Sequence, residues 1–160
     1  ISISLRKRLA PKLNFNLKLV NHKRVDPQFK NLKYKFILKH LSKMDTTCTD
    51  IGLCHNKNIL ESGTSNILFI KEDKIYSPGS GIYKGINYNF FKKKLVRIVN
   101  KEIPVNSLKI YDEILLIGSG KGIASVQTIN QIKWKRKSLK FYKILLNLYK
   151  KEILNCSLYR

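Results

Sequence analysis

The sequence lacks any apolar run that approaches the roughly 20 residues needed to cross a bilayer, so we expect no transmembrane helix. It also lacks the charged segment and apolar core that together mark a secretory signal peptide. Cysteine is scarce, and the spacing of Cys48, Cys54 and Cys156 matches no zinc-binding pattern. These absences predict a soluble protein of the reducing cytoplasm, without a metal centre.

Acidic residues are also few: 10 Asp and Glu stand against 32 Lys and Arg, which gives a net charge of +22. Such an excess attracts polyanions, and one hypothesis is a basic RNA- or ribosome-binding domain in which Trp134, within the basic cluster 133–137, stacks on a base. However, the lysines are spread along the chain, and no named nucleic-acid-binding motif is present. We therefore expect a solvated basic surface that binds nucleic acid only non-specifically at low salt.

The remaining pattern is that of one folded domain, since the chain has 160 residues of which 43% are hydrophobic. Alternation of apolar and polar residues predicts a strand over 14–20. Short apolar runs predict further strands over 50–55, 59–60, 67–70, 104–108 and 113–117. Helical spacing predicts helices over 30–44, 87–101 and 138–154. Strands mixed with three helices, without an internal repeat, predict an α+β (mixed α/β) fold.

Three segments carry residues suited to chemistry. The glycine-rich segment 118–122 directly follows a predicted strand, where backbone N–H groups can approach an anion. It matches neither the Walker A spacing nor the dinucleotide fingerprint, and a plain surface turn explains it equally well. The segment 61–66 joins two strands and offers Glu61 and Asn66 as polar groups or as a simple hairpin connection. The segment 29–34 places Lys30 at the start of a helix, but in so lysine-rich a chain one lysine carries no meaning alone.

In order and spacing, these segments resemble the class IV aminotransferases, the fold-type-IV pyridoxal-phosphate enzymes. That family includes branched-chain aminotransferases, D-amino-acid aminotransferases and 4-amino-4-deoxychorismate lyases. The resemblance extends over residues 14–130 and is carried by the segments 24–27, 30–34, 61–67, 77–78, 85–88 and 112–120. It implies that 14–160 is the C-terminal, cofactor-binding domain of such an enzyme. Residues 1–13 would then be a linker, or the remnant of an N-terminal domain that contributes to the phosphate site and the substrate pocket.

The resemblance also implies roles for single residues. Lys30 would be the catalytic lysine, joined to pyridoxal 5'-phosphate as a Schiff base and shuttling protons at the substrate carbon. Glu61 would pair with the ring nitrogen of the cofactor, and Tyr34 would lie near its phenolic oxygen. The cofactor phosphate would be held by Ile86, Asn87, Ser119 and Gly120.

Four positions depart from the family pattern. Asn87 and Tyr88 stand where threonine and arginine are usual, so one phosphate contact loses its hydroxyl group. Lys33 stands where asparagine is usual, and Ser119 replaces a threonine.

The reaction that the resemblance favours is that of a 4-amino-4-deoxychorismate lyase, which releases pyruvate to leave 4-aminobenzoate in folate biosynthesis. An alternative within the family is a branched-chain or D-amino-acid aminotransferase, whose substrate would be an amino acid. A homodimer with each active site near the subunit interface is implied in both cases. A third possibility is a remnant of the enzyme fold that binds no cofactor.

Overall fold

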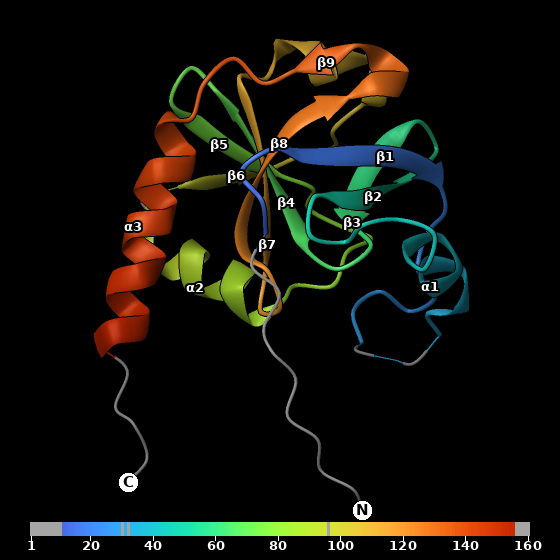
Figure 1. Cartoon of the computed structure of the whole chain (residues 1–160), viewed down its shortest axis with the longest axis horizontal. Helices are drawn as coiled ribbons and strands as arrows, with labels where there is room; N and C mark the ends of the chain where they lie inside the picture. Colours follow the sequence, from blue (N-terminus) through green and yellow to red (C-terminus); the bar gives the residue numbers. More distant parts are fainter. Residues whose placement is uncertain (1–10, 30, 32, 96, 156–160) are drawn as a thin grey trace, which may run out of the picture.

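The computed structural model describes residues 11–29, 31, 33–95 and 97–155, and within them one curled sheet dominates the fold (Figure 1). The strands are β1 (Phe15–Asn21), β2 (Thr49–His55), β3 (Asn58–Ser62), β4 (Asn66–Lys71), β5 (Lys74–Ser77), β6 (Ile98–Asn100), β7 (Glu113–Gly118), β8 (Gly122–Ile129) and β9 (Trp134–Lys135). The helices are α1 (Lys35–Leu41), α2 (Ile86–Lys94) and α3 (Lys140–Asn155), with 3₁₀ turns η1 (Val105–Ile110) and η2 (Asn130–Ile132). The expected α+β class is confirmed.

The sheet curls so that strands far apart in its order come together. The order is β3-β2-β1-β8-β7-β4-β5-β6, with β9 paired to β8. β3 is one end of this order, yet it runs directly into β4 through a short connection in which Ser62 N donates to Ser65 O at 2.8 Å. β4 must therefore lie beside the end of β3, and the connection between them faces the end of β7.

Both faces of β4 and β7 are covered, which explains their continuous apolar sequences. Phe69 and Leu116 belong to a large core cluster enclosed by the curl. Leu68 and Leu115 point to the opposite face, where they pack in a second cluster with residues of α2 and α3 such as Leu145. α1 lies on the other side of the molecule, against β2 (Figure 1). None of the described helices combines the length and apolarity that spanning a membrane requires.

Most of the predicted strands are confirmed, since β1, β2, β3, β4 and β7 fall where the sequence places them. The hairpin turns at Asn56-Lys57 and Glu72-Asp73 adopt positive φ angles of 48° to 63° at all four residues. This is the conformation that a two-residue hairpin with a right-handed twist requires. The terminal helix over 138–154 is confirmed as α3, whereas no structure was predicted for the segment that forms β8.

Three of the predicted elements are wrong in part. The strand over 104–108 is a 3₁₀ turn, in which Ser107 Oγ donates to Pro104 O at 2.8 Å. The helix over 87–101 ends at Lys94, and Ile98–Asn100 pairs in parallel with β5 as β6. The helix over 30–44 is reduced to α1, because the Asn31 side chain accepts from Lys33 N at 3.0 Å and holds the preceding chain in a loop.

Candidate active site

A pocket of about 300 Å³ opens where the curled sheet brings four segments together. Its walls are the β3–β4 connection, the end of β7, the start of α2 and one face of α1 with Arg24 beside it. Five residues predicted as cofactor ligands line it together: Tyr34, Glu61, Ile86, Asn87 and Ser119. Gly120 follows Ser119 in the exposed turn between β7 and β8. Lys30, the predicted catalytic residue, lies outside the described residues.

Glu61 is the buried acid of the pocket, at 3% exposure near the end of β3. Its Oε2 accepts from Tyr83 N at 3.3 Å, and its Oε1 lies 2.8 Å from Arg24 Nε as an ion pair. Within the described residues, neither Oε1 nor Nε makes a well-aligned hydrogen bond despite this short distance. Burial raises the pKa of Glu61 to about 7, although Arg24 and the Tyr83 N–H act in the opposite direction.

Arg24 connects Glu61 to the rest of this wall. Its guanidinium group lies over the Tyr34 ring at 4.8 Å and donates to Gly63 O at 2.8 Å. A cation stacked on an aromatic face and bonded to a carbonyl is held in one orientation. Arg24 therefore fixes the Glu61 carboxylate on the side of the pocket where Tyr34 stands.

Asn66 ties the sheet to the segment that leads into α2. Its Nδ2 donates to Tyr83 O at 2.6 Å, and its Oδ1 accepts from Gly85 N at 3.0 Å. The two bonds orient Gly85, the N-cap residue of α2. Gly85 has an extended backbone and no side chain, so it cannot cap the helix. The first N–H groups of α2 consequently face the pocket without a capping side chain, and such groups bind anions readily.

The β7–β8 turn closes this anion-binding corner at short range. Asn87 Nδ2 donates to Gly118 O at 3.0 Å, so the first turn of α2 is joined to the end of β7. A Cβ atom at Gly118 would lie 2.7 Å from Ser65 Oγ and 3.0 Å from Thr64 O. A side chain at this position would displace the Ser65 hydroxyl group and crowd Thr64 O, so glycine allows the turn to approach the β3–β4 connection this closely.

Tyr88 does not take part in this corner. Its side chain is fully buried in the cluster beneath α2, and its hydroxyl group donates to Asn100 Oδ1 at 2.9 Å. The position where the family pattern has arginine thus serves packing in this chain.

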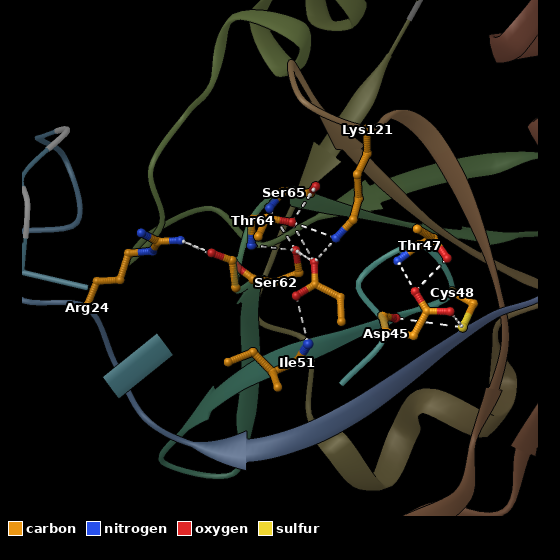
Figure 2. Close-up of polar contacts among 11 residues, drawn as sticks. Arg24, Asp45, Thr47, Cys48, Ile51, Ser62, Thr64, Ser65 and Lys121 are labelled. Atoms are coloured by element: carbon orange, nitrogen blue, oxygen red, sulfur yellow. Dashed lines mark hydrogen bonds and ion pairs between the residues drawn. The ribbon is translucent and has the colours of Figure 1, made fainter. Parts of the chain in front are cut away.

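Sequence reasoning missed Asp50 and Lys121, which bond to each other and to the β3–β4 connection. Figure 2 shows Lys121 reaching toward Thr64 in this connection. Asp50 is fully buried, and its Oδ2 accepts from Ser62 Oγ at 2.9 Å, Thr64 Oγ1 at 2.7 Å and Lys121 Nζ at 2.7 Å. One signal was available, because Lys121 belongs to the glycine-rich segment 118–122. Its partner, 71 positions away, gave no sign in the sequence.

Two other kinds of site were considered, a nucleic-acid-binding surface and a metal centre. Trp134, proposed as a base-stacking residue, is 2% exposed and its Nε1 donates to Tyr111 O at 3.1 Å. It belongs to the core cluster and cannot stack on a base, so that prediction is wrong. The described residues contain no group of His, Cys, Asp and Glu side chains arranged to hold a metal ion.

Comparison with known proteins gives a consistent result. The family model described as amino-transferase class IV matches residues 4–129. No curated protein sequence matches the chain. Its structure is similar to a branched-chain aminotransferase from Thermoproteus uzoniensis solved with norvaline (TM-score 0.73, 15% identity, covering 91% of this chain and 53% of that one).

Two further solved structures are similar to this fold. One is a protein assigned as a 4-amino-4-deoxychorismate lyase from Legionella pneumophila (TM-score 0.69, 17% identity, covering 94% of this chain and 59% of that one). The other is the pyridoxal-phosphate form of a branched-chain aminotransferase from Thermobaculum terrenum (TM-score 0.71, 15% identity, 88% and 51%). At these identities the likeness concerns the fold, and the chain spans just over half the length of each structure.

Proposed function

The chain belongs to the class IV aminotransferase family, and from this premise we propose that its pocket binds pyridoxal 5'-phosphate for catalysis. The observation that carries the proposal is that one pocket is lined by two groups of complementary chemistry. Glu61 is a buried acid whose Oε1 forms an ion pair with Arg24 but lacks an aligned hydrogen bond within the described residues. The start of α2 has no side-chain cap, and such helix starts bind anions readily. A cofactor with a cationic ring nitrogen at one end and a phosphate at the other fits this pair of groups.

Each residue of the pocket has a defined task in this proposal. The N–H groups of Ile86 and Asn87 bind the phosphate, and Ser119 adds a hydroxyl donor from the β7–β8 turn. The Glu61 carboxylate would accept a hydrogen bond from the protonated ring nitrogen and so keep the ring cationic, and Arg24 keeps that carboxylate in place. Lys30, from sequence alone, supplies the amine that bonds to the cofactor and moves the proton at the substrate carbon. When bound, the cofactor supplies an electron-accepting ring that stabilises negative charge on that carbon.

For the reaction, we propose the 4-amino-4-deoxychorismate lyase type, with release of pyruvate from an amino-chorismate. Its support is the sequence resemblance at Phe29-Lys30 and over 118–126, together with one structural neighbour assigned to that activity. The second candidate is amino-group transfer between an amino acid and a keto acid, which is favoured by the branched-chain aminotransferase neighbours. Pyruvate release from the amino-chorismate, or glutamate formation from 2-oxoglutarate, distinguishes the two. Both candidates are proposed to act as a homodimer.

The cofactor proposal is tested by chemical trapping on the full chain. Pyridoxal phosphate is added, the product is reduced with borohydride, and the labelled lysine is mapped by mass spectrometry. We expect the label on Lys30, its loss in Lys30→Ala, and its retention in the matched control Lys33→Ala. Label spread over many lysines without preference would contradict the proposal and favour a fold that binds no cofactor.

A further inference from the structure

The strongest polar feature outside the pocket lining is the ion pair between Asp50 and Lys121. Asp50 lies in β2 with its side chain fully buried, and the Lys121 side chain is 12% exposed. Their charged atoms are 2.7 Å apart, and Lys121 Nζ also donates to Thr64 Oγ1 at 2.7 Å. The lysine further lies over the Phe15 ring at 5.0 Å. Burying two charges costs free energy that their attraction offsets only in part, so stability alone is a weak reason for this pair.

The pair joins two walls of the pocket that the sequence separates widely. Through Asp50 it holds Ser62 and Thr64, which stand one and three positions after Glu61 in the chain. Through Lys121 it holds the β7–β8 turn, whose first residues, Gly118 and Ser119, line the pocket. The Asp50–Lys121 pair lies close to the point where Gly118 approaches Ser65, and a Cβ atom at Gly118 would lie 2.7 Å from Ser65 Oγ.

The β3–β4 connection is therefore bonded by two cationic side chains, Arg24 and Lys121. Figure 2 shows Arg24 and Lys121 approaching it from opposite directions. Arg24 holds Gly63 O on the pocket side, at 2.8 Å, while Lys121 holds Thr64 from behind. Asn87 makes a further tie at this corner, because its Nδ2 donates to Gly118 O at the end of β7 at 3.0 Å.

We propose that Lys121 and Asp50 are positioning residues that fasten the β7–β8 turn to the β3–β4 connection and so set the width of the phosphate corner. Neither residue lines the pocket, and both act through Thr64 and the turn. The identity of the ligand rests on the proposed function, whereas the connection between the two segments is a property of the chain without any ligand. The two statements are therefore tested by separate measurements.

The fastening is tested by amide hydrogen exchange on the full chain without cofactor. In Lys121→Met, we expect faster exchange in both 62–66 and 118–122, with α3 unchanged. Lys121→Arg should restore much of the protection, and Lys93→Met, which removes an exposed charge on α2, should leave both segments unchanged. Should Lys121→Met fail to fold, Asp50→Asn combined with Lys121→Met removes both charges and retains a hydrogen-bonding group for Ser62 and Thr64. Unchanged exchange in a folded variant, or faster exchange in only one of the two segments, would overturn the proposal.

The effect on the phosphate corner is tested by comparing pyridoxal phosphate with pyridoxal, which lacks the phosphate. We expect Lys121→Met to raise the dissociation constant of pyridoxal phosphate by about tenfold, the lower range for loss of a residue that supports a binding group. The constant for pyridoxal should change much less, and Lys121→Arg should bind pyridoxal phosphate nearly as the unchanged chain does. Equal losses for both ligands would refute a role in phosphate positioning. If the unchanged chain binds neither ligand, the proposed function fails, while the exchange experiment still decides the fastening.

Discussion

At the scale of single residues, the Glu61 carboxyl group makes stability depend on pH. A glutamate exposed to water has a pKa near 4.3, whereas the pKa of Glu61 in the folded chain is about 7. The unfolded chain therefore loses this proton at a lower pH than the folded chain does. Between these values the folded state binds more protons, and the free energy of unfolding falls as pH rises. A difference of this size corresponds to about 4 kcal/mol across the window.

The prediction is therefore that Glu61→Gln removes most of the loss of stability between about pH 4.5 and about pH 7. Urea titrations at several pH values measure it. Asp45, whose pKa is lowered chiefly by hydrogen bonds from Thr47, acts only at more acid pH and does not interfere. A variant as pH-sensitive as the unchanged chain in that window would show that Glu61 is not the group responsible.

The sequence could predict a residue when a short motif surrounds it, and not otherwise. Glu61, Asn87 and Ser119 were predicted from their motifs, and the structure places all three around one pocket. Arg24 lay within a matched segment, but no role could be read for it until it met Glu61, 37 positions later. In a chain with 32 Lys and Arg, no local pattern tells which cation meets a buried acid.

At the scale of elements, the start of α3 depends on Glu113. This buried carboxylate, at 1% exposure in β7, accepts from the backbone N–H groups of Phe141 and Tyr142 at 2.8 and 2.9 Å. It also accepts from Ser138 Oγ at 2.9 Å. An acid that satisfies the free N–H groups of a helix start stabilises that helix, through both the bonds and the helix dipole.

We predict that Glu113→Ala lowers the free energy of unfolding by about 2–4 kcal/mol, since buried N–H groups lose a charged acceptor. Ser138→Ala, which removes one of the bonds and leaves the carboxylate, should cost about 1 kcal/mol. Denaturant unfolding measures both changes. Because α3 lies away from the pocket, cofactor labelling of the folded variants should not change. Equal small losses in the two variants would mean that solvent replaces the carboxylate at the helix start.

The elements that were predicted wrongly are those decided by partners distant in sequence. β4 and β7 carry continuous apolar runs and were predicted correctly, because burial on both faces leaves a strong local signal. Ile98–Asn100 has a helical pattern with the preceding residues, yet pairing with β5 draws it into the sheet edge. Pro104 begins a 3₁₀ turn where an apolar run suggested a strand, because Ser107 bonds back to it.

At the scale of the whole molecule, the curl of the sheet creates the site, and the sequence contains no local record of it. β3 and β4 belong to opposite parts of the sheet order and meet through one short connection. Asp50 and Lys121 meet across this curl, as do the start of α2 and the end of β7. Family resemblance supplied which residues to examine, while the long-range contacts that orient them became visible only in three dimensions.

The net charge of +22 also belongs to the whole molecule, and it yields the last prediction. We expect a short RNA to bind at low salt and to be released as salt rises from about 0.05 M to about 0.5 M, since such binding depends on counterion release from phosphates. Labelling of Lys30 by pyridoxal phosphate should persist in the same high-salt buffer, because hydrogen bonds in a formed pocket are screened far less than exposed charges. Fluorescence anisotropy with a labelled oligonucleotide, run beside the trapping assay, measures both. RNA binding that survives high salt and prefers one sequence would instead revive the nucleic-acid hypothesis, although Trp134 is buried and could not be the stacking residue.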